Sequence, residues 1–142
     1  MPWEYLEEEA IADIGIKVTG KDLTELFTDA CLSIAHLMTK VDELDELMQK
    51  AIQFEETSLD LLLHSLLEEM VYLKDAELFF VKSVDLHVDE TENGFAVKGK
   101  FVGDLFDPEV DHIGNDIKAI TMHDFYVRQE GDGWVAHFII DI

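Results

Sequence analysis

Positively charged side chains are scarce in this 142-residue chain, which has 10 Lys and Arg residues against 32 Asp and Glu residues and a formal net charge of −22. Nucleic acids and anionic membranes are bound mainly through Lys and Arg, so the charge argues against either as a direct partner. No apolar run reaches the roughly 18 residues that a membrane span needs. The acidity is explained by solubility, by a salty cytoplasm or, most specifically, by a basic protein partner.

Cysteine is almost absent, since Cys31 is the only one. A single cysteine excludes an internal disulfide and a cysteine-based zinc site. Its neighbours are apolar residues at helical spacing, which predicts a small buried side chain rather than a nucleophile. The first five residues carry no basic region and no long apolar stretch of a signal peptide. We therefore expect a reducing compartment, the cytoplasm.

The motifs of common enzyme classes are missing too. The sequence contains no phosphate-cradling glycine loop, no nucleophile elbow and no metalloprotease helix motif. Most of the histidines have no ligand-type spacing to one another: His36, His64, His87, His112 and His137. The sequence alone therefore predicts no familiar catalytic constellation.

Apolar residues are abundant, at 48% of the chain, which is enough to build a core. The chain has 2 prolines and 8 glycines, and no linker-like segment divides it. Its length fits one domain. We therefore expect a single domain over residues 1–142.

The first forty residues predict a strand followed by a helix. Residues 14–18 alternate between apolar and other side chains, as in a half-buried strand that ends at Gly20. Asp22 and Glu25 have the spacing of a capping box, and apolar residues at helical spacing then continue to residue 38. We expect a helix of about four turns there.

A second helix is expected after an ambiguous stretch at 39–50, which also suits further helical turns, and a short strand at 52–54. Thr57 with Asp60 has the spacing of a helix start. The residues after it form a strongly apolar face: Leu59, Leu62, Leu63, Leu66, Leu67, Met70 and Val71, widened by Leu61 and Tyr72.

The second half of the chain has the pattern of antiparallel strands. We expect a long strand over 78–88, a hairpin turn at Asn93-Gly94 and a return strand over 95–101. After a polar loop over 104–116, strands are expected over 117–128 and 134–142. Helices early and hairpins late predict an α+β fold, with two main helices packed on antiparallel sheet.

Acidic residues at both ends of the chain are the first candidates for a site. Asp13 lies among apolar residues at a strand mouth, and the chain stops at Asp141-Ile142 without a polar tail. If the last strand is ordered, the Asp141 side chain and the Ile142 α-carboxylate are close enough to attract a hard cation such as Ca²⁺ or Mg²⁺. A solvated strand end and a frayed terminus are the simpler alternatives.

Lys118 is one of few cations in an acidic stretch, and the segment from Lys118 to His123 is the second candidate. On a strand, Lys118, Ile120 and Met122 would share one face and His123 would lie on the other. The simpler interpretation is a strand surface on which a lysine counters nearby aspartates.

Three segments together resemble the archease family over nearly the whole chain: Ala12-Asp13-Ile14-Gly15-Ile16, Lys118-Ala119-Ile120-Thr121-Met122-His123 and the terminal Asp141-Ile142. Their order, separation and the total length agree with that family. Ala10 and Ile11 stand where the family usually has His-Thr, and Met122 stands where it has Tyr.

The resemblance implies an accessory protein rather than an enzyme: an activator of an RtcB-type RNA-splicing ligase that acts in tRNA splicing. Such proteins promote guanylylation and multiple turnover of the ligase and can broaden its nucleotide use. The resemblance also implies a calcium-type metal site at Asp13, Asp141 and Ile142, with Mg²⁺ or Mn²⁺ as other candidates, and a functional role for Lys118 and His123. The alternatives are a metal-dependent hydrolase using Asp13, Asp141 and His123, and a chaperone-like binding module.

Overall fold

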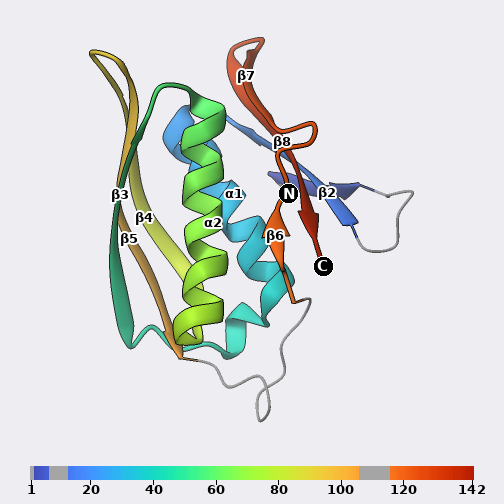
Figure 1. Cartoon of the computed structure of the whole chain (residues 1–142), viewed down its shortest axis with the longest axis vertical. Coiled ribbons are helices and arrows are strands. Elements are labelled where there is room, and N and C mark those ends of the chain that lie inside the picture. Colours follow the sequence, from blue (N-terminus) through green and yellow to red (C-terminus); the bar gives the residue numbers. More distant parts are fainter. Residues whose placement is uncertain (1, 7–12, 106–115) are drawn as a thin grey trace.

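Two helices lie between two antiparallel sheets in the computed structural model, which describes residues 2–6, 13–105 and 116–142 (Figure 1). The α+β prediction is confirmed. In chain order the elements are β1 (Trp3–Leu6), β2 (Asp13–Gly20), α1 (Leu23–Met38), the 3₁₀ turn η1 (Val41–Glu43), β3 (Met48–Glu56), α2 (Leu59–Glu77), β4 (Phe79–Thr91), β5 (Gly94–Leu105), β6 (Ala119–Ile120), β7 (Tyr126–Glu130) and β8 (Gly133–Asp141).

The two sheets differ in how far apart their strands lie in the sequence. The sheet β3-β5-β4 comes from the middle of the chain. The other sheet has the order β1-β2-β8-β6, with β7 also pairing with β8, so it joins the first strands to the last. The two ends of the chain therefore meet in one sheet, which the candidate site requires.

The core fills the space between the sheets. Both helices contribute to it, and its largest fully buried side chains include Phe27, Phe79, Phe80, Phe101 and Phe138. In β2 and β8 the inward residues alternate with outward ones, since Ile16, Val18, Phe138 and Ile140 are fully buried. Burial of one face fixes the register, because a slip by one residue would expose the whole apolar set.

The predicted start of α1 is confirmed. The Asp22 carboxylate accepts a hydrogen bond from the Glu25 backbone N–H at 2.8 Å, and the Glu25 carboxylate accepts one from the Lys21 N–H at 3.3 Å. This arrangement satisfies N–H groups that have no partner within the helix.

The start of α2 differs from the prediction by one residue. Ser58, not Thr57, caps the helix, and its hydroxyl accepts from the Leu61 N–H. Leu61 and Tyr72 do not widen the buried face, since they are 41% and 58% exposed. These two side chains lie outside the buried face of the helix, which is formed by Leu62, Leu63, Leu66, Leu67, Met70, Val71, Leu73 and Lys74. Leu78, predicted in the next strand, ends the helix in a left-handed conformation.

Two strand predictions also needed correction. The ambiguous stretch 39–50 holds η1 and then the start of β3, which is 9 residues long rather than a short strand. The predicted strand over 117–128 is broken into β6 and β7, because the chain turns between them and Asp124 has a positive φ of 51°. The polar loop over 104–116 lies largely outside the described residues.

The hairpin between β4 and β5 is confirmed, with a different central pair. Thr91 pairs with Gly94, so Glu92 and Asn93 form the turn. Gly94 is required for another reason: a Cβ there would lie 2.2 Å from the Glu56 carbonyl oxygen.

Within the described residues, no helix is long and apolar enough to cross a membrane.

The position of Cys31 gives a test of the core. Its side chain is fully buried, and burial raises the pKa of its thiol far above the usual range. We expect a thiol reagent to label the native protein about a thousandfold more slowly than the denatured protein, because the thiol must wait for an opening that costs on the order of 5 kcal/mol. Absorbance of the released thiolate, with and without urea, measures this. Equal rates in the two conditions would contradict the packing of α1.

Candidate functional site

Asp13 and Asp141 lie directly opposite each other, where β2 begins and β8 ends. Opposed residues in antiparallel strands have Cα atoms about 4.5–5.5 Å apart and side chains on the same face. Because Ile14 and Ile140 pack against the core, the two carboxylates lie on the other face of the sheet. The structure thus brings together two aspartates that are 128 positions apart in the sequence (141 − 13).

The two carboxylates are not paired with a cation among the described residues. Neither makes a hydrogen bond or an ion pair with another residue of ranges 2–6, 13–105 and 116–142, and both are half-buried. Two carboxylates about 4 Å apart repel by roughly 1 kcal/mol in water and roughly 4 kcal/mol at an effective dielectric constant of about 20. A cation between them would remove this repulsion.

Ile142 extends the same edge by one residue. Its side chain is partly buried against the core, which holds its main chain next to Asp141. The Asp141 carbonyl oxygen already accepts a hydrogen bond from the Lys118 N–H at 2.8 Å. The side-chain oxygens at this edge are those of the Asp13 and Asp141 carboxylates, and the main chain of Ile142 continues beside them.

Lys118 reaches this edge through its backbone. It comes just before β6, in which Ala119 pairs with Asp141. Its side chain is exposed and has no hydrogen bond or ion pair to a described residue. The predicted sharing of a face by Lys118, Ile120 and Met122 is wrong, since Ile120 is buried and Met122 is exposed. Two residues of strand are too few to carry that alternation through the segment.

His123 is not part of the carboxylate edge. It lies in the turn after β6, where its ring is 3.2 Å from the Asp124 carboxylate. The carbonyl of Asp124 accepts a hydrogen bond from His137 Nδ1 at 2.6 Å. His137 precedes Asp141 by four residues in β8, which is roughly 13 Å of strand.

Sequence reasoning missed two side chains of α2 that contact the segment around β6. Lys74 is buried and donates to the Asp116 carboxylate and the Ile117 carbonyl, and His64 Nε2 donates to the Ile120 carbonyl at 2.8 Å. The sequence could have identified Lys74, because this lysine continues the apolar stripe of Leu67, Met70 and Val71. A lysine in such a stripe needs a buried partner.

The donor set at the edge fits a hard divalent cation. All the oxygens are carboxylate oxygens, which Ca²⁺, Mg²⁺ and Mn²⁺ prefer and which are poor selectors for softer metals. No group of three or more His, Cys, Asp or Glu side chains in the described part of the chain is placed to hold a metal ion. Within the described residues, the edge offers two such side chains, Asp13 and Asp141.

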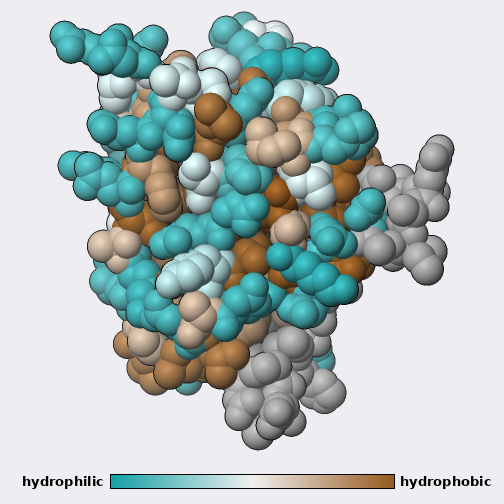
Figure 2. All heavy atoms as spheres, viewed as in Figure 1, coloured by the Kyte–Doolittle hydropathy of each residue, from teal (hydrophilic) through white to brown (hydrophobic). Residues whose placement is uncertain are grey.

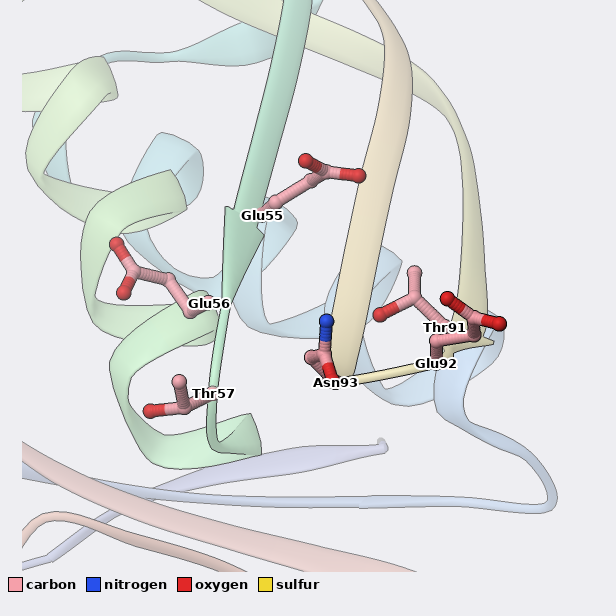
Figure 3. Close-up of a pocket in the computed structure, with 6 residues that line it drawn as sticks. All are labelled: Glu55, Glu56, Thr57, Thr91, Glu92 and Asn93. Carbon is pink, nitrogen blue, oxygen red and sulfur yellow. The ribbon is translucent and has the colours of Figure 1, made fainter.

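A separate hollow lies where β3 ends beside the β4–β5 hairpin (Figure 3). It is lined by Glu55, Glu56, Thr57, Thr91, Glu92 and Asn93. The Glu56 carboxylate accepts a hydrogen bond from Ser65 at 3.3 Å and is therefore partly engaged within the fold. None of the candidate site residues lines this hollow.

Comparison with known proteins gives a consistent picture. Residues 3–142 match the model of the Archease protein family (MTH1598/TM1083). The chain is 34% identical to protein archease of Thermococcus kodakarensis over 99% of this chain and 98% of that protein, and 32% identical to protein archease of Archaeoglobus fulgidus over 100% of both.

The fold is also that of solved structures. The solution structure of Methanobacterium thermoautotrophicum protein 1598 matches with a TM-score of 0.86 at 24% identity, over 99% of each chain. The crystal structure of an archease from Thermotoga maritima, described as a possible chaperone, matches with a TM-score of 0.60 at 16% identity, over 96% of each chain. At these identities the two structures support the fold alone.

Proposed function

The chain belongs to the archease family, and from that premise we propose that it is an accessory activator of an RtcB-type RNA-splicing ligase. In this proposal it acts in the cytoplasm in tRNA splicing, promotes guanylylation and multiple turnover of the ligase, broadens its nucleotide use and performs no chemistry alone. The observation that best supports the proposal is the pairing of Asp13 with Asp141, which places two candidate ligands opposite each other in one sheet.

The proposed site holds one divalent cation, Ca²⁺ first and Mg²⁺ or Mn²⁺ otherwise. Asp13, Asp141 and the α-carboxylate of Ile142 would be its protein ligands. A bound cation supplies positive charge that offsets the repulsion between the carboxylates. If each of these carboxylates binds through one oxygen, three or more of the six to eight positions of Ca²⁺ are open to oxygens of the ligase or its nucleotide.

Lys118 and His123 take different places in the proposal. The backbone of Lys118 is bonded to Asp141, so its exposed ammonium is free to contact a nucleotide or an acidic group of the ligase beside the cation. His123 is exposed and away from the carboxylate edge, which makes it a contact residue at most. This separation also weighs against a hydrolase, since such an enzyme would need His123 as a base near Asp13 and Asp141.

The net charge of −22 supports association with a basic partner. An RNA-binding ligase carries basic surface, and opposite charge speeds diffusional encounter. Salt screens this attraction, so association should slow as ionic strength rises.

The cation site gives the first test. We expect Asp13→Asn to weaken Ca²⁺ binding by about tenfold or more, because it removes a charged ligand, and Asp141→Asn to do the same. Calorimetric titration at a fixed, moderate salt concentration measures the affinity. Asp42→Asn is the matched control: it makes the same change in net charge at an exposed residue of η1 and should leave the affinity unchanged. Equal affinities for all four proteins would show that binding is only diffuse surface attraction.

Activation of the ligase gives the second test. With the cognate ligase in excess over this protein, we expect guanylylation to accelerate, and Asp13→Asn or Asp141→Asn to abolish the acceleration while Asp42→Asn keeps it. Lys118→Ala should reduce it without unfolding the protein, because substitution of an exposed residue changes stability by about 0.5 kcal/mol or less. The time course of labelled ligase formation is the measurement. No acceleration with any divalent cation would refute the proposed function, and protection of the ligase from aggregation instead would favour the chaperone alternative.

A further inference from the structure

We propose that Lys74 is a positioning residue for the carboxylate edge: its buried ammonium fixes residues 116–118 beside β8 and thereby the main chain next to Asp141. The inference rests on the proposed function, because the position of this edge matters only if the edge binds a cation. It also makes a structural claim that is measurable without any cation.

Lys74 is held by three partners and is 4% exposed. Its Nζ lies 2.6 Å from the Asp116 carboxylate, 2.8 Å from the Asp75 carboxylate and 2.7 Å from the Ile117 carbonyl oxygen. An ammonium group has three donors, so each has a partner. A buried cation without such partners is strongly destabilising. Because separating residues 116 and 117 from α2 would leave the Lys74 ammonium unpaired, these contacts hold the two residues against the helix.

The contact between Lys74 and Ile117 is connected to Asp141 through a single peptide unit. Ile117, whose carbonyl accepts from Lys74, is fully buried. The next residue, Lys118, donates its N–H to the Asp141 carbonyl oxygen at 2.8 Å. The peptide unit that joins Ile117 to Lys118 therefore bonds α2 on one side and β8 on the other. Its orientation fixes the place of Asp141 relative to α2.

The strand β6 cannot supply this order by itself. It has 2 residues, and an isolated pairing of that length is not stable. Figure 1 shows β6 beside α2 and near the C-terminal end of β8. The helix makes two further hydrogen bonds to residues 119–130. His64 donates to the Ile120 carbonyl, and the Asp60 carboxylate accepts from the Val127 N–H at 2.7 Å. Of these three contacts, that of Lys74 is next to the bond on Asp141.

Removal of the ammonium should loosen this segment without unfolding the protein. In Lys74→Met the apolar stem keeps its place among the core residues of α2. The carboxylates that lose their partner do not become stranded charges, because the side chains of Asp75 and Asp116 are 59% and 65% exposed. The Ile117 carbonyl, which belongs to a fully buried residue, also loses its donor, so the cost of the substitution falls on the segment that is tested.

The matched control is Lys50→Met. Lys50 also pairs with a carboxylate of α2, Glu77 at 2.6 Å, and its Nζ lies over the Phe79 ring, 5.8 Å from the ring centroid. It belongs to β3, in the other sheet. Both variants lose one lysine and an ion pair to a carboxylate of α2, Asp75 for Lys74 and Glu77 for Lys50. They differ in the contacts to Asp116 and Ile117, which only Lys74 makes.

The experiment compares the wild type, Lys74→Met and Lys50→Met by two readouts. Amide hydrogen exchange followed by NMR reports the Lys118 N–H, with the strand amides of β3 and β5 as internal reference. Calorimetry with Ca²⁺ alone reports the affinity of the edge, with Asp13→Asn as the variant that lacks the site. We expect Lys74→Met to exchange the Lys118 amide at least about tenfold faster and to lower the Ca²⁺ affinity by about tenfold, the loss typical when a residue supporting a metal ligand is removed. Lys50→Met should do neither.

Each other outcome overturns a defined part of the account. Unchanged exchange at Lys118 in Lys74→Met refutes the positioning role, and so does faster exchange with unchanged Ca²⁺ affinity. Faster exchange throughout β3 and β5 as well would show that Lys74 only stabilises the whole fold. If the wild type itself binds no Ca²⁺ beyond that of Asp13→Asn, the proposed function fails, and the exchange at Lys118 still decides whether Lys74 holds the segment.

Discussion

The antiparallel pairing of β2 with β8 is the constraint on which the rest of the structure depends. It runs from Asp13 opposite Asp141 to Gly20 opposite Trp134, and it joins the beginning of the chain to its end. The buried residues Ile16, Val18, Phe138 and Ile140 fix its register from the core side. A shift by one residue would bury the aspartates and expose the apolar side chains, so the packing of the core also decides where the two carboxylates meet.

The pairing concentrates negative charge in a molecule that already has a large excess of it. A fold selected for stability alone gains nothing from two opposed carboxylates without a partner among the described residues, since like charges directly opposite each other destabilise a sheet. The cost is understandable if the edge binds a cation. On the face shown in Figure 2, hydrophilic residues alternate with hydrophobic patches, one of which lies at the end at which α2 and β5 terminate.

Local patterns in the sequence were sufficient for most elements but not for their pairing. The Asp22–Glu25 cap, the apolar stripe of α2 and the hairpin before Gly94 depend on neighbours in sequence, and each was predictable. The broken strand after Lys118 was not, because its course is set by Lys74 and His64 of α2, more than 40 positions away (117 − 74 = 43). Asp13 and Asp141 were recognisable as candidates, yet only the register of β2 and β8 brings them together. His123 belongs to the same motif as Lys118 but lies in the turn after β6, and no local pattern distinguishes the two.

The central claim is that the paired aspartates hold one divalent cation, and anomalous X-ray scattering from crystals grown with Mn²⁺ tests it most directly. The account predicts a single strong peak on the outer face of the sheet, within about 2.6 Å of oxygens from both Asp13 and Asp141. It also predicts that the peak vanishes in Asp13→Asn crystals grown under the same conditions. A peak coordinated elsewhere, or none at this edge at saturating Mn²⁺, would contradict the account.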